Sequence, residues 1–139
     1  MNFATLLSHT FTKAAPRGLA SAYLFGSQAQ ARAHAESDID VGILLQRAIY
    51  PNARERFEAR LTLTAMLIGV LGTNEVDLVV LNDVPPELGR HIVTQGQRVY
   101  CADQQLDHDF VRDVQLRAAD LAPFLRRTRR IKLQALERS

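Results

Sequence analysis

The apolar residues of the chain recur at two spacings, one typical of helices and the other typical of strands. Near the N-terminus the helical spacing predicts a short amphipathic helix over residues 3–14. Its apolar positions are Phe3, Leu6, Leu7 and Phe11. Pro16 and Gly18 follow directly, and because both residue types interrupt helices, the segment should end there.

A longer helical pattern covers residues 53–71, after a connection that contains Pro51 and Asn52. We expect one apolar face of this helix to pack on the rest of the protein. The positions that define the face are Phe57, Leu61, Ala65 and Ile68, and Leu63, Leu67 and Val70 widen it.

Local signals predict further helices. A short one would begin right after Ser27, and another would run to residue 94 from a turn that contains Pro85 and Pro86. The residues from 104 onward also have a helical pattern, in which Pro123 marks either a kink or the first turn of a new helix.

Four short apolar runs are predicted to be strands. They span residues 19–25, 38–45, 75–81 and 97–101. Strands and helices in this order indicate an α+β, or α/β-like, fold with a small mixed sheet of about four strands flanked by helices. The long helix between the second and third strands permits a right-handed crossover, so these two strands should be parallel.

The composition is that of one globular domain. Of 139 residues, 47% are hydrophobic and 23% charged, so a single core can form without a metal or disulfide staple. The one cysteine, Cys101, excludes an intrachain disulfide and favours a reducing cytoplasm. Because no apolar run approaches the roughly 18 residues of a membrane span, we expect a soluble protein with no membrane partner.

Positive charge is concentrated at the C-terminal end. Residues 126–139 hold six Arg and Lys against one Glu, whereas residues 1–125 hold 11 against 14 Asp and Glu. This segment could contact nucleic-acid phosphates or dock on an acidic partner protein. A solvated helix face is favoured over direct nucleic-acid binding, because apolar residues recur behind the arginines.

Carboxylates occur at positions where strands should bring them together. Asp38 and Asp40 are two residues apart, so their side chains would project to one side while Ile39 and Val41 face the core. Two carboxylates this close repel each other, which raises the pKa of one of them unless a cation such as Mg²⁺ neutralises the charge. The alternative is that both carboxylates are solvated or cap a helix or turn. Asp77 is an ionised residue within an apolar run, so it should pair with a base or reach the same metal site.

The turn at Gly26 and Ser27 and the four histidines are further candidates for functional roles. The turn at Gly26 and Ser27 could present amide donors to a phosphate at a helix N-terminus, or it could be an ordinary turn. His34 is expected to be a loop residue on the surface. The other histidines, which have no partner at metal-ligand spacing, are His9, His91 and His108.

Taken in order, Gly26-Ser27, ten intervening positions, Asp38-Ile39-Asp40 and the isolated Asp77 form a three-part motif. With the segments YLFGS and SDIDVGILL, this motif resembles the nucleotidyltransferase superfamily related to DNA polymerase beta. It resembles specifically the minimal nucleotidyltransferases (MNT), which are usually antitoxins partnered with HEPN-domain toxins. The resemblance covers about residues 19–102.

The resemblance implies a role for each residue of the motif. Gly26 and Ser27 would hold the β- and γ-phosphates of ATP, Asp38 and Asp40 would bind two Mg²⁺ or Mn²⁺ ions, and Asp77 would share the catalytic metal and help to deprotonate the acceptor hydroxyl. Members of the family often have Arg followed by Gly after the Gly-Ser step. This chain has Gln28 there, so Arg32 is the candidate replacement for the phosphate-contacting arginine.

The resemblance therefore predicts a cytoplasmic antitoxin that transfers AMP from ATP to a hydroxyl, expected to be a tyrosine, of a HEPN toxin with which it assembles. A single domain would span residues 1–139, with 104–139 as a helical, Arg-rich extension. A binding-only antitoxin and a small-molecule nucleotidyltransferase are the alternatives. The three carboxylates favour an enzyme, and the short chain leaves little room for the extra domain that small-molecule transferases usually carry.

Overall fold

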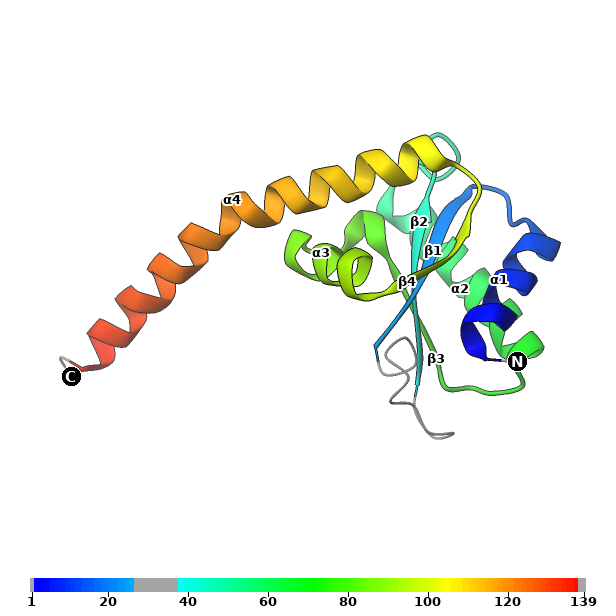
Figure 1. The fold of residues 1–139 in the computed structure, drawn as a ribbon, viewed down its shortest axis with the longest axis horizontal. Helices are drawn as coiled ribbons and strands as arrows, with labels where there is room; N and C mark the ends of the chain where they lie inside the picture. The colour runs from blue at the N-terminus through cyan, green and yellow to red at the C-terminus, as the bar shows by residue number, and fades with distance from the viewer. Residues whose placement is uncertain (1, 27–37, 138–139) are drawn as a thin grey trace.

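Four strands form one mixed sheet, with helices on both of its faces (Figure 1). The computed structural model describes residues 2–26 and 38–137, with side chains as far as Asp120. The strand order is β3-β2-β1-β4, and β1 is antiparallel to both β2 and β4, whereas β2 and β3 are parallel. The elements are α1 (Phe3–Ala14), β1 (Leu19–Phe25), β2 (Ile39–Leu45), α2 (Ala53–Leu71), β3 (Val76–Val80), the 3-10 turn η2 (Leu81–Asp83), α3 (Pro86–Gln95), β4 (Gln97–Cys101) and α4 (Gln104–Glu137). The predicted α+β class and the parallel pair are confirmed.

The sheet has one hydrophobic cluster on each face. Helices α1 and α2 cover one face, and α3 and the first turns of α4 cover the other. Along β2, Ile39, Val41 and Ile43 are buried in the first cluster, as the alternation of strand side chains requires. Asp40 and Leu44 therefore lie on the other face, where Leu44 belongs to the second cluster.

Helix ends follow local sequence signals. The side chain of Asn2 accepts a hydrogen bond from the backbone N–H of Thr5 at 2.8 Å, and Asn52 does the same for Glu55 at 2.9 Å. Helix α2 ends at Gly72, whose φ of 71° suits a residue without a side chain.

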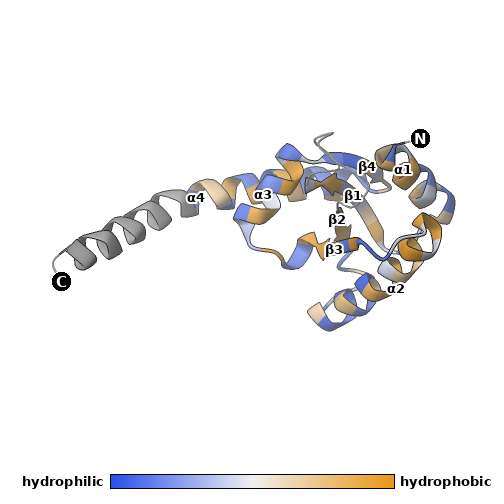
Figure 2. Cartoon of the chain, turned by 90° about the horizontal axis from the view of Figure 1, so that it is seen from below, coloured by the Kyte–Doolittle hydropathy of each residue, from blue (hydrophilic) through white to orange (hydrophobic). Residues whose placement is uncertain are grey.

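Helix α2 buries only the part of the predicted face formed by Leu63 and Leu67, which were expected to widen it. Phe57 is 50% exposed and Leu61 54% exposed, although both were expected to face the core. The buried residues of the helix are Arg56, Ala59, Leu63 and Leu67. Hydrophobic residues recur along the whole helix (Figure 2), so its sequence offers two apolar sides, and tertiary packing selects one of them.

The C-terminal segment is one continuous helix. Helix α4 runs through Pro123 to Glu137, so of the two alternatives predicted for this proline, a kink or the start of a new helix, the second is wrong. A helix can continue past a proline at the cost of one backbone hydrogen bond. The axis of α4 curves as the helix extends away from the sheet (Figure 1). The short helix predicted after Ser27 lies outside the described residues. Among the helices described, none is both long enough and apolar enough to cross a membrane.

Candidate active site

Strand register places two of the predicted aspartates directly side by side. Asp40 of β2 is the partner of Asp77 in the parallel ladder between β2 and β3. Because paired residues of neighbouring strands point to the same face, both carboxylates project from the face that α3 covers further along the sheet. Asp38 precedes β2 by one residue and is exposed.

Gly26 lies against the Asp40 carboxylate. Phe25, the last residue of β1, is paired with Asp40 across the antiparallel ladder, and Gly26 follows it with a φ of 75°. A Cβ atom at Gly26 would overlap Asp40 Oδ2. Because L side chains rarely adopt this φ and a Cβ would displace the carboxylate, glycine is strongly favoured at the point where β1 ends and the site begins.

The carboxylates perturb one another. The pKa of Asp40 is raised, first because the group is partly desolvated, and then because of the negative charges of Asp77 and Asp38. A hydrogen bond to Asp38 and the charge of Asp38 raise the pKa of Glu75. The site therefore contains four acidic side chains rather than three.

Glu75 was missed in the sequence, although a signal for it exists. Glu75 and Asp77 are two residues apart at the start of a strand, as Asp38 and Asp40 are. The backbone N–H of Ile39 donates a hydrogen bond to the carbonyl of Glu75 at 2.8 Å, which aligns the two acidic pairs. Two acidic pairs of equal spacing at the starts of parallel strands would have indicated this arrangement.

Asp77 has a basic partner from another element. Arg60 Nη2, on α2, lies 3.9 Å from Asp77 Oδ1, and the Arg60 guanidinium lies over the Phe57 ring at 5.9 Å from its centroid. The sequence left a salt bridge and a metal site as alternatives for Asp77; the Arg60 guanidinium lies within salt-bridge distance, and the metal role stays a prediction. Nothing in the local sequence marked Arg60, because its contact with Asp77 depends on how α2 packs beside β3.

The donor set suits a hard divalent cation by its chemistry. Carboxylate oxygens are the preferred ligands of Mg²⁺. A bound cation would offset the repulsion from Asp77 and Asp38, which adds to desolvation in raising the pKa of Asp40. Within the described residues, no three His, Cys, Asp or Glu side chains already converge to hold a metal ion. Asp77 would have to exchange Arg60 for the cation. Ser27, Arg32 and His34 lie outside the part of the chain that the structure describes.

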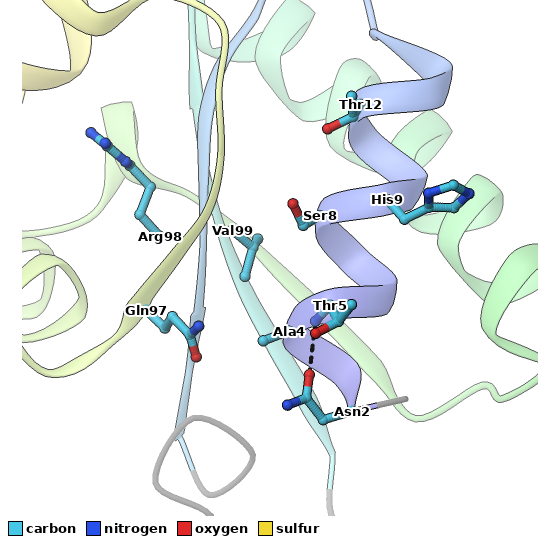
Figure 3. A pocket seen from close by; sticks show the side chains of 9 residues that line it. All are labelled: Asn2, Ala4, Thr5, Ser8, His9, Thr12, Gln97, Arg98 and Val99. Carbon is cyan, nitrogen blue, oxygen red and sulfur yellow. Dashed lines mark hydrogen bonds between the residues drawn. The ribbon is translucent and has the colours of Figure 1, made fainter.

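A separate hollow of about 500 Å³ lies between α1 and β4 (Figure 3). Ser8 and His9 both line it, but their side chains point to different sides of α1, so they do not form a nucleophile and base pair. None of the site carboxylates lines this hollow. It is therefore distinct from the carboxylate site.

The buried carboxylate of Asp107 ties α4 to the sheet. Asp107 is 2% exposed and accepts hydrogen bonds from Ser21 Oγ at 2.6 Å, Tyr23 Oη at 2.8 Å and Arg98 Nη1 at 3.0 Å. Burial and the bond to Asp107 raise the pKa of Tyr23. The sequence analysis did not single out Asp107. Its hydrogen bonds to β1 and β4 indicate a structural role.

A mixed sheet with paired acidic residues on adjacent parallel strands, and a glycine turn against them, is the arrangement of a nucleotidyltransferase. Residues 9–105 match the family described as polymerase beta, nucleotidyltransferase, and the chain belongs to this family. The family resemblance inferred from the motif is confirmed.

Among solved structures, the chain is similar to chains of toxin–antitoxin complexes. The chain is 26% identical to one in the crystal structure of a toxin–antitoxin pair with AMP-PNP, with a TM-score of 0.64, covering 97% of this chain and 98% of that one. A chain in the structure of a tri-AMPylated Shewanella oneidensis HEPN toxin with its MNT antitoxin shares the fold at 24% identity, with a TM-score of 0.60 and coverage of 97% and 99%. A third, in a MntA–HepT toxin–antitoxin structure, has a TM-score of 0.57 at 24% identity and 96% coverage of both chains. No curated protein matches the chain.

Proposed function

We propose that this chain is an MNT-type antitoxin that transfers AMP from ATP to a hydroxyl group of a HEPN-type toxin and thereby neutralises it. The observation that carries the proposal is the pairing of Asp40 with Asp77 in adjacent parallel strands, beside a glycine of positive φ that lies against the Asp40 carboxylate. The similarity to a toxin–antitoxin chain crystallised with AMP-PNP supports the nucleotide and the partner.

Each residue of the site has a role in this proposal. Asp38, Asp40 and Asp77 would hold two Mg²⁺ or Mn²⁺ ions, which when bound stabilise the attacking and leaving oxygens of an in-line displacement. Gly26 would let the phosphates approach the backbone, and Ser27 would donate to them. Arg32 would contribute a positive charge to the phosphates.

The proposed transfer balances as a single displacement. The acceptor oxygen forms a bond to the α-phosphorus of ATP, and the bond between that phosphorus and the bridging oxygen breaks, so that pyrophosphate leaves. Asp77 accepts the proton of the acceptor hydroxyl. Asp77 is suited to this role because its side chain is 57% exposed and can meet a macromolecular acceptor.

The whole chain would act as one domain in a cytoplasmic complex with the toxin, and α4 would extend from that domain toward the partner. The relative described as an MNT antitoxin in complex with a tri-AMPylated HEPN toxin supports both the partner and the modification. No nucleic acid is required as a partner in this proposal.

Mass spectrometry of the partner tests the proposal. A HEPN-type protein is first sought among the products of the neighbouring genes. It is then incubated with the parent chain, ATP and Mg²⁺, and an added AMP is expected. The Asp40→Asn variant should give no adduct, whereas Glu87→Gln, an exposed carboxylate on α3, should behave as the parent. Neutralisation of the partner with no adduct would instead support a binding-only antitoxin.

A further inference from the structure

The outer surface of α2 carries an apolar stripe. Phe57, Leu61, Ala65 and Ile68 follow one another at helical spacing, so they share one side of the helix, opposite the residues that pack on the sheet. Phe57 and Leu61 are about half exposed, Ala65 is exposed and Ile68 is half-buried. We call these four residues the outer stripe. Figure 2 shows α2 at the periphery of the molecule, with apolar residues along its length.

The outer stripe is electrically neutral. From Leu61 to Asn74 the sequence contains no charged residue. Nearer the start of α2, Arg54 and Glu58 are exposed and pair with each other, with Arg54 Nε at 3.5 Å from Glu58 Oε1. A strongly acidic or strongly basic surface would therefore find no electrostatic complement on this side of the helix.

Large and small residues alternate around Ala65. Leu61 lies four residues before Ala65, and Gly69 lies four residues after it. The space where a Cβ would stand at Gly69 is open, so a side chain from another molecule can approach the helix there. If two α2 helices cross antiparallel at Ala65, Leu61 of each copy meets Gly69 of the other. The large residue then fills the space beside the small one in both contacts.

We propose that the outer stripe is the contact surface of a homodimer, in which the α2 helices of two copies pack antiparallel about a two-fold axis near Ala65. Charge selects a second copy as the occupant. A two-fold axis brings each residue beside it against the same residue of the other copy, so a charged residue there would meet its like. The uncharged run from Leu61 to Asn74 avoids this repulsion, and exposed contiguous apolar surface is typical of protein contacts.

Sedimentation velocity of the full chain at increasing concentrations tests the contact. We expect the parent to pass from monomer to dimer as the concentration rises. Ala65→Arg should raise the Kd of the dimer at least about 100-fold, because two like charges would meet at the axis. The fold of this variant, which circular dichroism reports, should be unchanged because Ala65 is exposed. A parent that stays monomeric, or an Ala65→Arg variant that dimerises as the parent does, would overturn the proposal.

The matched control is on the same helix. Val70 is 52% exposed, but it lies two residues past Ile68 and therefore on a different side of α2 from the outer stripe. Val70→Arg adds the same charge as Ala65→Arg and should leave the Kd of the dimer unchanged. Equal losses in both variants would mean that added charge, and not its position, weakens the association, and the assignment of the contact would be wrong.

A size exchange separates close packing from non-specific apolar association. Gly69→Leu adds an apolar side chain to an open surface, so non-specific association would become tighter. In the proposed contact the new side chain would overlap Leu61 of the other copy, and the Kd should rise about tenfold. Adding Leu61→Ala should recover most of this loss, since the large and small residues have then exchanged places. Tighter association of Gly69→Leu, or no recovery in the double variant, would contradict the contact.

The same variants detect a different occupant. If the parent is monomeric and Ala65→Arg no longer co-purifies with the HEPN-type protein, whereas Val70→Arg does, the outer stripe binds that protein and the homodimer is wrong. The outer stripe contains none of the site carboxylates, and AMP transfer is decided separately by the adduct on the partner. Failure of the homodimer therefore leaves the proposed function standing, and failure of the proposed function leaves the homodimer standing.

Discussion

Arg60 and Asp77 meet across the free edge of the sheet, with Arg60 Nη2 at 3.9 Å from Asp77 Oδ1. The pair joins α2 to the start of β3, and it places a positive charge at the acidic site without any ion. A divalent cation would compete with Arg60 for Asp77. The Arg60 guanidinium thus takes the place that a cation would have beside Asp77. Because both side chains are partly exposed, this ion pair is weak.

The first prediction concerns the metal ligands. Asp38→Ala and Asp40→Ala should abolish AMP transfer but leave the fold intact, because each change removes a ligand and also relieves carboxylate repulsion. Thermal melts in EDTA should show a Tm equal to or above that of the parent. Parental transfer rates with radioactive ATP would contradict the metal assignment, and a lower Tm in EDTA would contradict the repulsion.

The second prediction is a dependence of stability on pH. Asp40 has a folded-state pKa above its ordinary value of 3.8, so the folded protein holds this proton more tightly than the unfolded chain does. The associated stabilisation is fully present below pH 3.8 and is lost as the pH rises through the raised pKa. Urea unfolding without metal should show that the free energy of unfolding falls with rising pH in the parent, and falls less in Asp40→Asn. Equal pH profiles of the two proteins would refute the prediction.

The third prediction separates catalysis from binding. Asp77→Asn preserves the shape of the strand but removes the charge, so transfer should fall at least about 100-fold, the scale of a lost general base. Partner binding, followed by co-purification, should be unchanged. In a co-expression assay, full rescue by Asp77→Asn with no AMP on the partner in either sample would support a binding-only antitoxin.

The fourth prediction compares two glycines. Gly26→Ala should destabilise the protein by about 1–3 kcal/mol, because φ is 75° and the new Cβ would overlap the Asp40 carboxylate. Gly69 lies inside α2, and no atom lies within 4 Å of the position that a Cβ would take there, so Gly69→Ala should stabilise by about 0.5–1 kcal/mol. Urea unfolding of both variants measures the contrast. Equal effects would argue against the close approach at Gly26.

The fifth prediction concerns the anchor of α4. Asp107→Ala should cost about 2–4 kcal/mol, because the hydroxyl groups of Ser21 and Tyr23 lose their buried acceptor. Tyr23→Phe removes only one of these hydrogen bonds and should cost about 1 kcal/mol. Chemical denaturation followed by circular dichroism tests both values. An Asp107→Ala variant as stable as the parent would show that the network does not hold α4 to the sheet.

The sequence alone was sufficient for the order of the elements, because helix and strand periodicities are local. The spacing of Gly26, Asp38, Asp40 and Asp77 also identified the family, since these residues mark the ends and starts of strands. Their individual roles stay predictions, and Ser27 and Arg32 lie outside the described residues.

Tertiary structure decided what local patterns leave open. Helix α2 has two apolar sides, and the packing of Leu63 and Leu67 on the sheet chose between them, which left Phe57 at the surface. The register between β2 and β3 set Asp40 beside Asp77, and the position of α2 brought Arg60 to the same carboxylate. These contacts join residues far apart in the chain, so the free energy that selects them comes from packing between elements and not from any single segment.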